Sequence, residues 1–260
     1  MIKLGDTDIS NIKLGDTQVE KIYQGNSLVW ERAIPNFITS GLTMRVDANN
    51  PLSFDGTSII KDISGNGLNG TLNGGITPNV KGLSFDGTTN FINFGDILDI
   101  GTSDFSMTIW AKFNPQSGFR GIIGKNAYSA MLGRYGIYQL STNNISGLVE
   151  PTLYTNIESQ NITGSTKFSQ FNSYTMVYKR NKGLLFYING IFTKIVSNVN
   201  STNLNTSGNF YIGVYGNVSG TSPQVSSYTS MIFGEAFTNN IALTAEQVLQ
   251  NHNALKGKYT

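Results

Sequence analysis

The chain has 260 residues, a length that suits one large β domain with a short additional segment. It is 39% apolar and 13% charged, with 29 glycines and a net charge of +2, which disfavours a charged helical bundle and a nucleic-acid-binding surface. Cysteine is absent and histidine occurs once, so disulfides, thiolate metal sites and multi-histidine zinc sites are excluded.

The sequence predicts neither a secretory signal nor a membrane span. The first residues reach Gly5 and Asp6 without an apolar core. The longest apolar run, Leu184–Ile188, is far shorter than the roughly 20 residues that a membrane-spanning helix needs. We therefore expect a soluble chain without a membrane partner.

The first thirty residues contain three ten-residue repeats, beginning at Ile2, Ile12 and Ile22. Each repeat places β-forming residues on both sides of a Gly-Asp or Gly-Asn pair, which predicts two short strands around a tight turn. A β segment this short buries too little apolar surface to fold alone, so residues 1–31 should need a partner surface. We call residues 1–31 the repeat segment.

Three partners for the repeat segment are considered. It could dock on another protein, trimerise around an axis, or add strands to the main domain of its own chain. We favour the first two, which make it an anchoring or oligomerisation segment. The predicted interface consists of its apolar positions, which are Ile2, Leu4, Ile9, Ile12, Leu14, Val19, Ile22, Tyr23, Leu28, Val29 and Trp30.

Residues 32–40 contain Pro35 and lose the repeat, so they are predicted to form a linker. Residues 41–260, which we call the head, alternate short β-type runs with clusters of Gly, Asn, Asp and Ser, and this predicts an all-β sandwich. In Phe105–Phe113 the large apolar residues fall mainly on alternate positions, as in a strand that covers a core. The other clear runs are Leu83–Phe85, Phe91–Phe94, Gly136–Leu140, Thr175–Lys179, Leu184–Ile188, Phe210–Val214 and Met231–Phe237.

One helix is predicted near the end of the chain, over residues 245–256. Thr244 and Gln247 fit a capping box at its start, and Gly257 follows as a stop signal. His252 lies on the apolar stripe of this helix, four residues after Val248. We interpret His252 as a packing residue.

Seven motifs follow one another along the head. They are Asp62–Gly70, Leu83–Phe91, Phe105–Phe113, Tyr174–Tyr178, Leu185–Gly190, Phe210–Gly213 and Ala242–Gln247. In this order they resemble the laminin-G-like, concanavalin-A-type lectin domains, in which Tyr174–Tyr178 and Leu185–Gly190 correspond to paired strands that end in an Asn-Gly turn, here Asn189-Gly190. The resemblance implies a concanavalin-A-like jelly-roll sandwich with a short C-terminal helix, a fold that hosts lectins, glycosidases and adhesion modules.

The repeated Ile-x-Leu-Gly-Asp-Thr motif, at residues 2–7 and 12–17, is similar to N-terminal segments of tailed-bacteriophage fibre and decoration proteins. This resemblance implies a virion-surface protein that is assembled in the bacterial host cytoplasm. We therefore predict a non-enzymatic virion structural protein, a homo-oligomer with a trimer favoured, that contacts other virion proteins through its β-repeat anchor. Host-surface glycans are the expected ligands of the head. The alternatives are a cellular carbohydrate-binding or adhesion module and an atypical glycoside hydrolase.

The sequence offers no clear catalytic group. A glycosidase needs two carboxylates about 5 to 9.5 Å apart. No two of the six glutamates share a short strand, and every aspartate lies at or before Asp104. Ser-His-Asp chemistry would depend on His252 and lacks a nucleophile elbow. We expect no catalytic residues.

We also expect no cofactor, with structural calcium as the alternative. Carboxylates are preferred calcium ligands, but the Asp-Gly and Asp-x-Ser-Gly motifs of this chain are equally typical of turns. The aspartates concerned are Asp47, Asp55, Asp62, Asp86, Asp96, Asp99 and Asp104.

A glycan site is expected where aromatic and polar side chains gather. The stretch between Phe119 and Tyr135 alternates such residues with glycines, and an equally weighted alternative assigns its aromatics to the core. The candidate glycan-binding residues are Phe119, Arg120, Tyr128, Arg134 and Tyr135.

Overall fold

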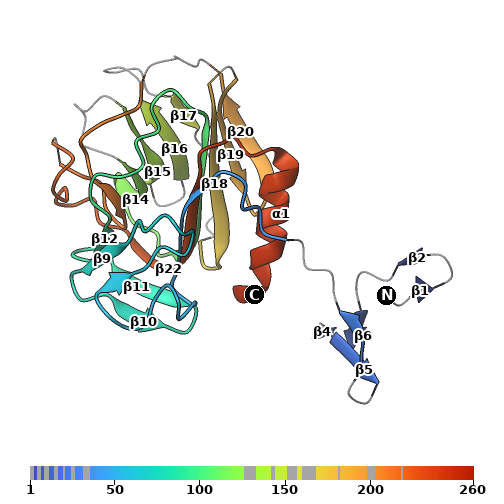
Figure 1. The fold of residues 1–260 in the computed structure, drawn as a ribbon. Coiled ribbons are helices and arrows are strands. Elements are labelled where there is room, and N and C mark those ends of the chain that lie inside the picture. Colours follow the sequence, from blue (N-terminus) through green and yellow to red (C-terminus); the bar gives the residue numbers. More distant parts are fainter. Residues whose placement is uncertain are drawn as a thin grey trace.

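The computed structural model describes residues 36–125, 133–141, 144–150, 168–180, 182–197, 203–217 and 219–260, and the backbone of the strands within 1–31 and 157–159. Two eight-stranded antiparallel sheets pack face to face, and helix α1 (Ala245–Leu255) lies against one of them (Figure 1). The prediction of an all-β sandwich with one short C-terminal helix is confirmed.

We call the first sheet the β22 sheet, after the strand that joins its two halves. β22 pairs with β13 along one edge and with both β11 and β7 along the other. The strands of this sheet are β7 (Leu42–Asp47), β10 (Thr77–Asn79), β11 (Gly82–Asp86), β13 (Phe105–Phe113), β18 (Asn172–Lys179), β19 (Gly183–Ile188), β20 (Ile191–Val196) and β22 (Ser230–Asn239).

We call the second sheet the β15 sheet. β15 lies between β14 and β16, and β21 connects these strands to β12, β9 and β8. The strands of this sheet are β8 (Ile59–Ile60), β9 (Gly70–Asn73), β12 (Phe91–Asn93), β14 (Arg120–Lys125), β15 (Arg134–Ser141), β16 (Asn144–Glu150), β17 (Ile157–Ser159) and β21 (Phe210–Ile212).

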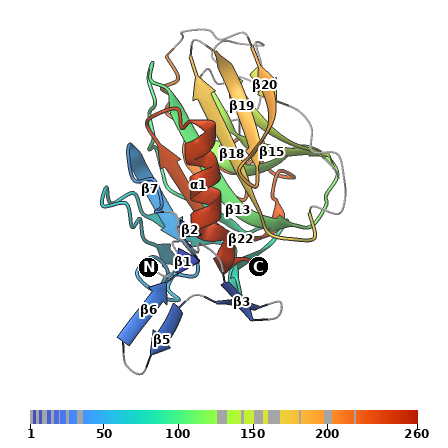
Figure 2. The same cartoon turned by 90° about the vertical axis from the view of Figure 1, so that its right-hand side faces the viewer.

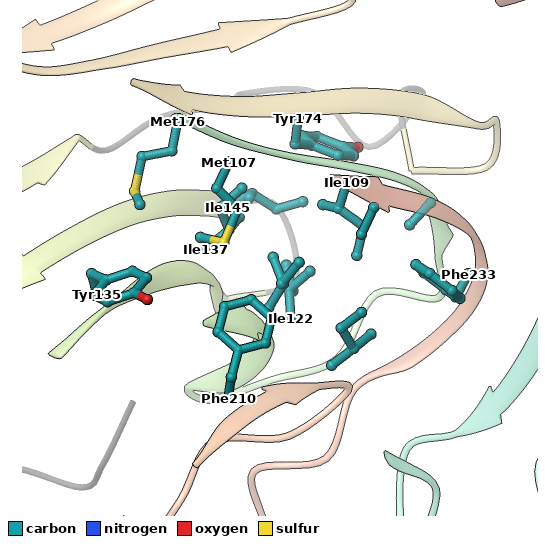
Figure 3. Close-up of a cluster of buried hydrophobic side chains, with 14 of the residues drawn as sticks. Met107, Ile109, Ile122, Tyr135, Ile137, Ile145, Tyr174, Met176, Phe210 and Phe233 are labelled. Atoms are coloured by element: carbon teal, nitrogen blue, oxygen red, sulfur yellow. The ribbon is translucent and has the colours of Figure 1, made fainter. Parts of the chain in front are cut away.

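The main core lies between the two sheets. Figure 3 shows Met107 and Ile109 of β13 beside Ile122, Ile137 and Ile145 of the β15 sheet. All five side chains are at most 1% exposed. Because side chains alternate along a strand, β13 points Met107 and Ile109 into this core. Burial of each such side chain stabilises the fold by about 1.5 to 3 kcal/mol.

An Asn-Gly turn joins β19 to β20 and makes them a hairpin. Asn189 and Gly190 have φ angles of 54° and 76°, and Ile188 and Ile191 on either side are cross-strand partners. Two successive residues with positive φ match the right-handed twist of the strands that they join. The expected turn at this position is confirmed.

Helix α1 begins with the expected capping box. The amide of Gln247 donates to Thr244 Oγ1 over 3.3 Å, and the amide of Thr244 donates to Gln247 Oε1 over 2.9 Å. The helix ends at Leu255, one residue before the predicted end, and a 3-10 turn (Lys256–Lys258) follows. Within the described residues no helix is long and apolar enough to cross a membrane.

The C-terminal region covers the outer face of the β22 sheet (Figure 2). Trp110 of β13 stacks on both His252 and Tyr259, with ring centroids 5.0 Å and 4.7 Å apart. His252 Nδ1 also lies 2.9 Å from Ser173 Oγ. His252 is thus a packing residue, as the sequence predicts.

Charged residues that are distant in the chain meet beside this aromatic stack. Asp47 of β7 and Glu235 of β22 are cross-strand partners. Lys258 Nζ donates to Asp47 Oδ2 over 2.6 Å and to Glu235 Oε2 over 2.8 Å, and Arg45 Nε donates to Glu235 Oε1 over 2.7 Å. Burial raises the pKa of Glu235 above its ordinary value. Lys258 and Arg45 supply the positive charges that this buried carboxylate needs.

The repeats of residues 1–31 form three hairpins, and each pair of strands flanks its Gly-Asp or Gly-Asn pair, as the sequence predicts. Within the described backbone, each hairpin is a separate two-stranded sheet and forms no ladder with the sandwich. Ile2 and Ile9 lie outside the described residues, and the division into anchor, linker and head stays a prediction. The hairpins are β1 (Lys3–Leu4) with β2 (Thr7–Asp8), β3 (Ile12–Leu14) with β4 (Thr17–Val19), and β5 (Lys21–Gln24) with β6 (Ser27–Glu31).

The single histidine should make the stability of the head depend on pH. Burial, with a smaller effect from the charge of Lys256, lowers the pKa of His252 to about 4 in the folded state. Its unfolded pKa is about 6.5, so neutral His252 contributes stability above that pH, and the contribution is lost as the pH falls toward 4. We expect the melting temperature to decrease as the pH falls from about 7 to about 5. Histidine is the one type of side chain whose ordinary pKa lies in this interval.

The variant His252→Phe keeps an aromatic ring against Trp110 but cannot take up a proton. Its melting temperature, followed by circular dichroism, should vary less between about pH 7 and about pH 5 than that of the unmodified chain. An equally steep decrease in the variant would show that His252 is not the group responsible.

Candidate functional site

A cavity of about 270 Å³ lies at one end of the sandwich, and we call it the end cavity. Its volume is close to the lower limit of about 300 Å³ for small-molecule pockets, which suits one small polar molecule. Both sheets and the segment that precedes β13 contribute to its walls. The lining residues are Thr43, Leu98, Asp99, Ile100, Ser103, Phe105, Ser106, Tyr135, Thr238, Asn239 and Asn240.

One wall is held in place by a buried lysine. The side chain of Lys125 on β14 is 0% exposed, and its Nζ donates to Asp96 Oδ1 over 2.5 Å and to Asp99 Oδ1 over 2.6 Å. The two carboxylates are about half exposed, so water still solvates them while the ammonium group stays in the protein interior. Lys125 thereby fixes the segment that brings Leu98 and Asp99 to the cavity.

Tyr135 holds the same wall from the side of the core. Its hydroxyl donates to the carbonyl oxygen of Leu98 over 2.5 Å, and its ring lies 4.9 Å from that of Phe105. Leu98 has a φ of 59°, a left-handed conformation that is uncommon outside glycine and persists only where surrounding contacts impose it. Burial raises the pKa of Tyr135 well above its ordinary value, with additional effects from Asp99 and Asp96, so its hydroxyl stays protonated and donates.

The polar groups of the cavity are mostly paired with the protein itself. Ser106 Oγ donates to the carbonyl of Ile241, and Thr43 and Thr238 share a hydroxyl–hydroxyl hydrogen bond of 2.7 Å. Asn239 is different. Its Nδ2 donates to the carbonyl of Ser40 over 3.0 Å, but its buried Oδ1 has no hydrogen-bond partner within the described residues. A buried acceptor without a donor is destabilising, so a ligand group that donated a hydrogen bond to this oxygen would be favoured.

The structure describes four of the five residues that the sequence marks as glycan-binding candidates, and it separates them. Of these four, only Tyr135 lines the end cavity, and its side chain is also part of the core (Figure 3). Arg134 is buried and forms an ion pair with Glu150, its cross-strand partner on β16. The burial of Tyr135 agrees with the alternative that assigns these aromatics to the core.

Phe119 and Arg120 lie elsewhere. Phe119 packs in a separate aromatic cluster, 4.6 Å from Tyr138 and 5.1 Å from Tyr215 between ring centroids. Arg120 donates to two backbone carbonyl oxygens. Tyr128 lies outside the described residues. A role of any of these residues in glycan binding stays a prediction.

The aspartates considered for calcium take part in turns and ion pairs. Asp62 accepts from the amides of Arg45, Ser64 and Leu68, and Asp86 accepts from those of Thr88 and Thr89. Asp47, Asp55, Asp96 and Asp99 pair with lysines, and Asp104 accepts from the amide of Arg180. Over the described part of the chain, no three His, Asp or Glu side chains are close enough to hold a metal ion.

The fold brings together a pair of carboxylates that no pattern in the sequence indicates. Asp47 and Glu235 lie opposite each other on β7 and β22, far apart in the chain. A search for acids on one strand cannot find such a pair, and no other signal in the sequence marks it. Because Lys258 donates to both carboxylates, they form a structural ion-pair network.

Comparisons with known proteins identify a shared fold and no family. No protein-family model matches the sequence, and no curated protein matches it. A structure described as "Cell entry of botulinum neurotoxin type C is dependent upon interaction with two ganglioside molecules" is 13% identical with a TM-score of 0.66, and the match covers 84% of this chain and 52% of that chain.

Two further structures show the same likeness. The binding domain of botulinum neurotoxin DC in complex with SialylT has a TM-score of 0.63, with 13% identity over 84% of this chain. The binding domain of Paraclostridial Mosquitocidal Protein 1 has a TM-score of 0.62, with 13% identity over 82% of this chain. The matches cover 52% of each of those chains, so this chain corresponds to about half of each. The likeness shows a common β-sandwich fold.

The buried ion pair of Arg134 predicts a structural role for this residue. Arg134→Ala would leave Glu150, whose side chain is 3% exposed, without its guanidinium partner. Loss of one partner of a buried pair costs about 3 to 5 kcal/mol, which lowers the melting temperature of a domain of this size by about 6 °C or more.

Arg120→Ala is the matched control, because Arg120 is half-exposed and donates only to backbone carbonyls. Its cost should stay below about 1 kcal/mol, as for most surface substitutions. The structural role of Arg134 would be contradicted if thermal unfolding showed the same small loss of stability for both variants.

Proposed function

We propose that the head is a non-enzymatic module that binds a glycan in the end cavity. The observation that carries this proposal is the composition of the cavity, in which apolar and aromatic walls surround hydroxyl, amide and carboxylate groups. Sugars combine apolar C–H faces with hydroxyl groups, so such a lining complements them. Lys125 behind the wall and Tyr135 within it are fixed by hydrogen bonds, which would limit the entropy lost on binding.

The similar structures support a binding module. They are described as binding domains of toxins, one in complex with SialylT, and another concerns interaction with ganglioside molecules. These ligands belong to the proteins named there. For this chain, they favour a glycan over other classes of small polar ligand.

The acidic residues support the non-enzymatic part of the proposal. Glu235 and Asp47 share Lys258, and Glu150 pairs with Arg134. None of these carboxylates lines the end cavity, and a general acid must lie within hydrogen-bond reach of the group that it protonates.

We further propose that the repeat segment attaches the head to a larger particle. Two-stranded hairpins present backbone groups along both edges, which another chain can pair with. The similarity of the repeated motif to phage fibre and decoration segments favours a tailed-bacteriophage virion as that particle, with a trimer as the favoured oligomer. A cellular adhesion module remains the alternative.

Blocking the cavity tests the proposed ligand site. Ser103 is exposed and lines the cavity, so Ser103→Trp should fill the cavity without disturbing the core. On a glycan array probed with the full chain, we expect binding of at least one glycan class and about a tenfold or greater loss in this variant, equivalent to about 1.4 kcal/mol.

Ser117→Trp serves as the matched control, since Ser117 is equally exposed and lies outside the cavity. It should bind as the unmodified chain does. Absence of any glycan signal from the full chain would refute the proposed function. Release of sugar products from a bound glycan would refute its non-enzymatic part.

Attachment is tested at the middle repeat. Leu14 lies on β3, and Leu14→Asp would place a charge in any interface that the apolar positions form, at a cost of several kcal/mol. We expect the variant to keep the melting temperature of the head but to lose oligomerisation and incorporation into particles. Size-exclusion chromatography with light scattering and particle pull-down would measure both.

Lys13→Glu is the control, because alternation along a strand assigns Lys13 to the face opposite that of Leu14. It should assemble normally. Normal assembly by Leu14→Asp would show that the repeats are not the attachment element.

A further inference from the structure

We infer that the end cavity selects an uncharged sugar that offers hydroxyl donors, and that it excludes sialylated and other acidic sugars. This inference rests on the proposed glycan-binding function and specifies its ligand class. Two features of the described residues carry it. They are the charge of the cavity wall and the hydrogen-bond acceptors that the protein leaves unused.

The charge of the wall opposes an acidic ligand. Among the described lining residues, Asp99 is the one ionisable carboxylate, and none is a lysine or an arginine. A carboxylate of an acidic sugar would therefore approach Asp99 without a cation to pair with, and like charges in a confined, partly desolvated site repel each other.

The nearest cations are already engaged behind the wall. Lys125 is fully buried and holds Asp96 and Asp99 together. Arg180 donates from its guanidinium to the carbonyl oxygens of Ser103 and Gly101. Neither side chain lines the cavity, so neither provides an anchoring point for an anionic group.

The acceptors require a ligand that donates hydrogen bonds. Asn239 Oδ1 is buried without a partner, and the donation of Nδ2 to Ser40 keeps the amide from turning over. Asp99 accepts from Lys125 and Thr206 through Oδ1, and its Oδ2 makes no hydrogen bond within the described residues. Sugar hydroxyls can donate to both oxygens, whereas a sugar carboxylate can only accept.

The size of the cavity limits the ligand further. A volume of about 270 Å³ lies below that of pockets for drug-sized molecules, which begin near 300 Å³. The cavity therefore fits a single terminal sugar unit, while the rest of a longer glycan would extend into solvent. A terminal sialic acid in the cavity would bring its carboxylate into a site whose one ionisable lining carboxylate is Asp99.

The experiment uses the full chain on an array that pairs neutral glycans with their sialylated forms, including lactose and sialyllactose. We expect the neutral member of at least one pair to bind and sialylation to lower its signal about tenfold or more. Asn239→Leu should lower the neutral signal to a similar extent. Asp99→Asn keeps the acceptor but removes the charge, so it should raise the sialylated signal relative to the neutral one.

Asp104→Asn is the matched control for charge, since Asp104 lies near the cavity but does not line it. Asp104→Asn should show the same ratio of neutral to sialylated signal as the unmodified chain. Melting temperatures of all variants show whether a lost signal reflects unfolding. If Asn239→Leu fails to fold, the inference is tested by the ratio of the sialylated to the neutral signal of Asp99→Asn.

The outcomes separate this inference from the proposed function. Preferred binding of sialylated glycans that Ser103→Trp abolishes would overturn the inference and leave the proposed function intact. An unchanged preference in a folded Asp99→Asn variant would overturn the inference as well. Absence of binding to every glycan would overturn the proposed function itself.

Discussion

Glu235 is a fully buried carboxylate, and the need to neutralise its charge determines how the head is closed. The positive charges come from Arg45 on β7 and from Lys258 in the turn after α1. This pairing brings the C-terminal region onto the β22 sheet, where Tyr259 and His252 stack on Trp110. The outer face of the sheet is thereby covered by the chain itself. The end cavity lies at the margin of this covered face, lined in part by β7 and β22.

A second ionic cluster has a different role. Lys125 is buried, yet the carboxylates that it binds remain about half exposed, and one of them, Asp99, lines the end cavity. The position of Asp99 at the cavity wall is therefore set from inside the protein. Tyr135 fixes Leu98 of the same wall through its hydroxyl. Lys125, which does not line the cavity, thus determines where a group that does line it is held.

The sequence allowed prediction of those features that depend on neighbouring residues. Alternation identified β13 with both of its ends, the capping box located the start of α1, and Asn189 with Gly190 marked a hairpin. The site could not be predicted in the same way. Tyr135 and Arg134 lie between glycines in a stretch that reads as an exposed loop, although cross-strand pairing buries both. The lining of the end cavity, like the pairing of Asp47 with Glu235, joins residues far apart in the chain, and local patterns carry no information about such contacts.

The position of β22 has a consequence for how the protein is made. This strand binds β13, β11 and β7, yet it follows all of them along the chain. During synthesis the earlier strands must therefore wait with open edges until β22 emerges, which makes folding slow and exposes the nascent chain to aggregation. The hairpins of residues 1–31 pair only residues that are close in the chain, so their formation on a partner surface does not have to wait for β22. Assembly partners could thus engage the repeats before the head is complete, so that order of synthesis and order of assembly would become coupled.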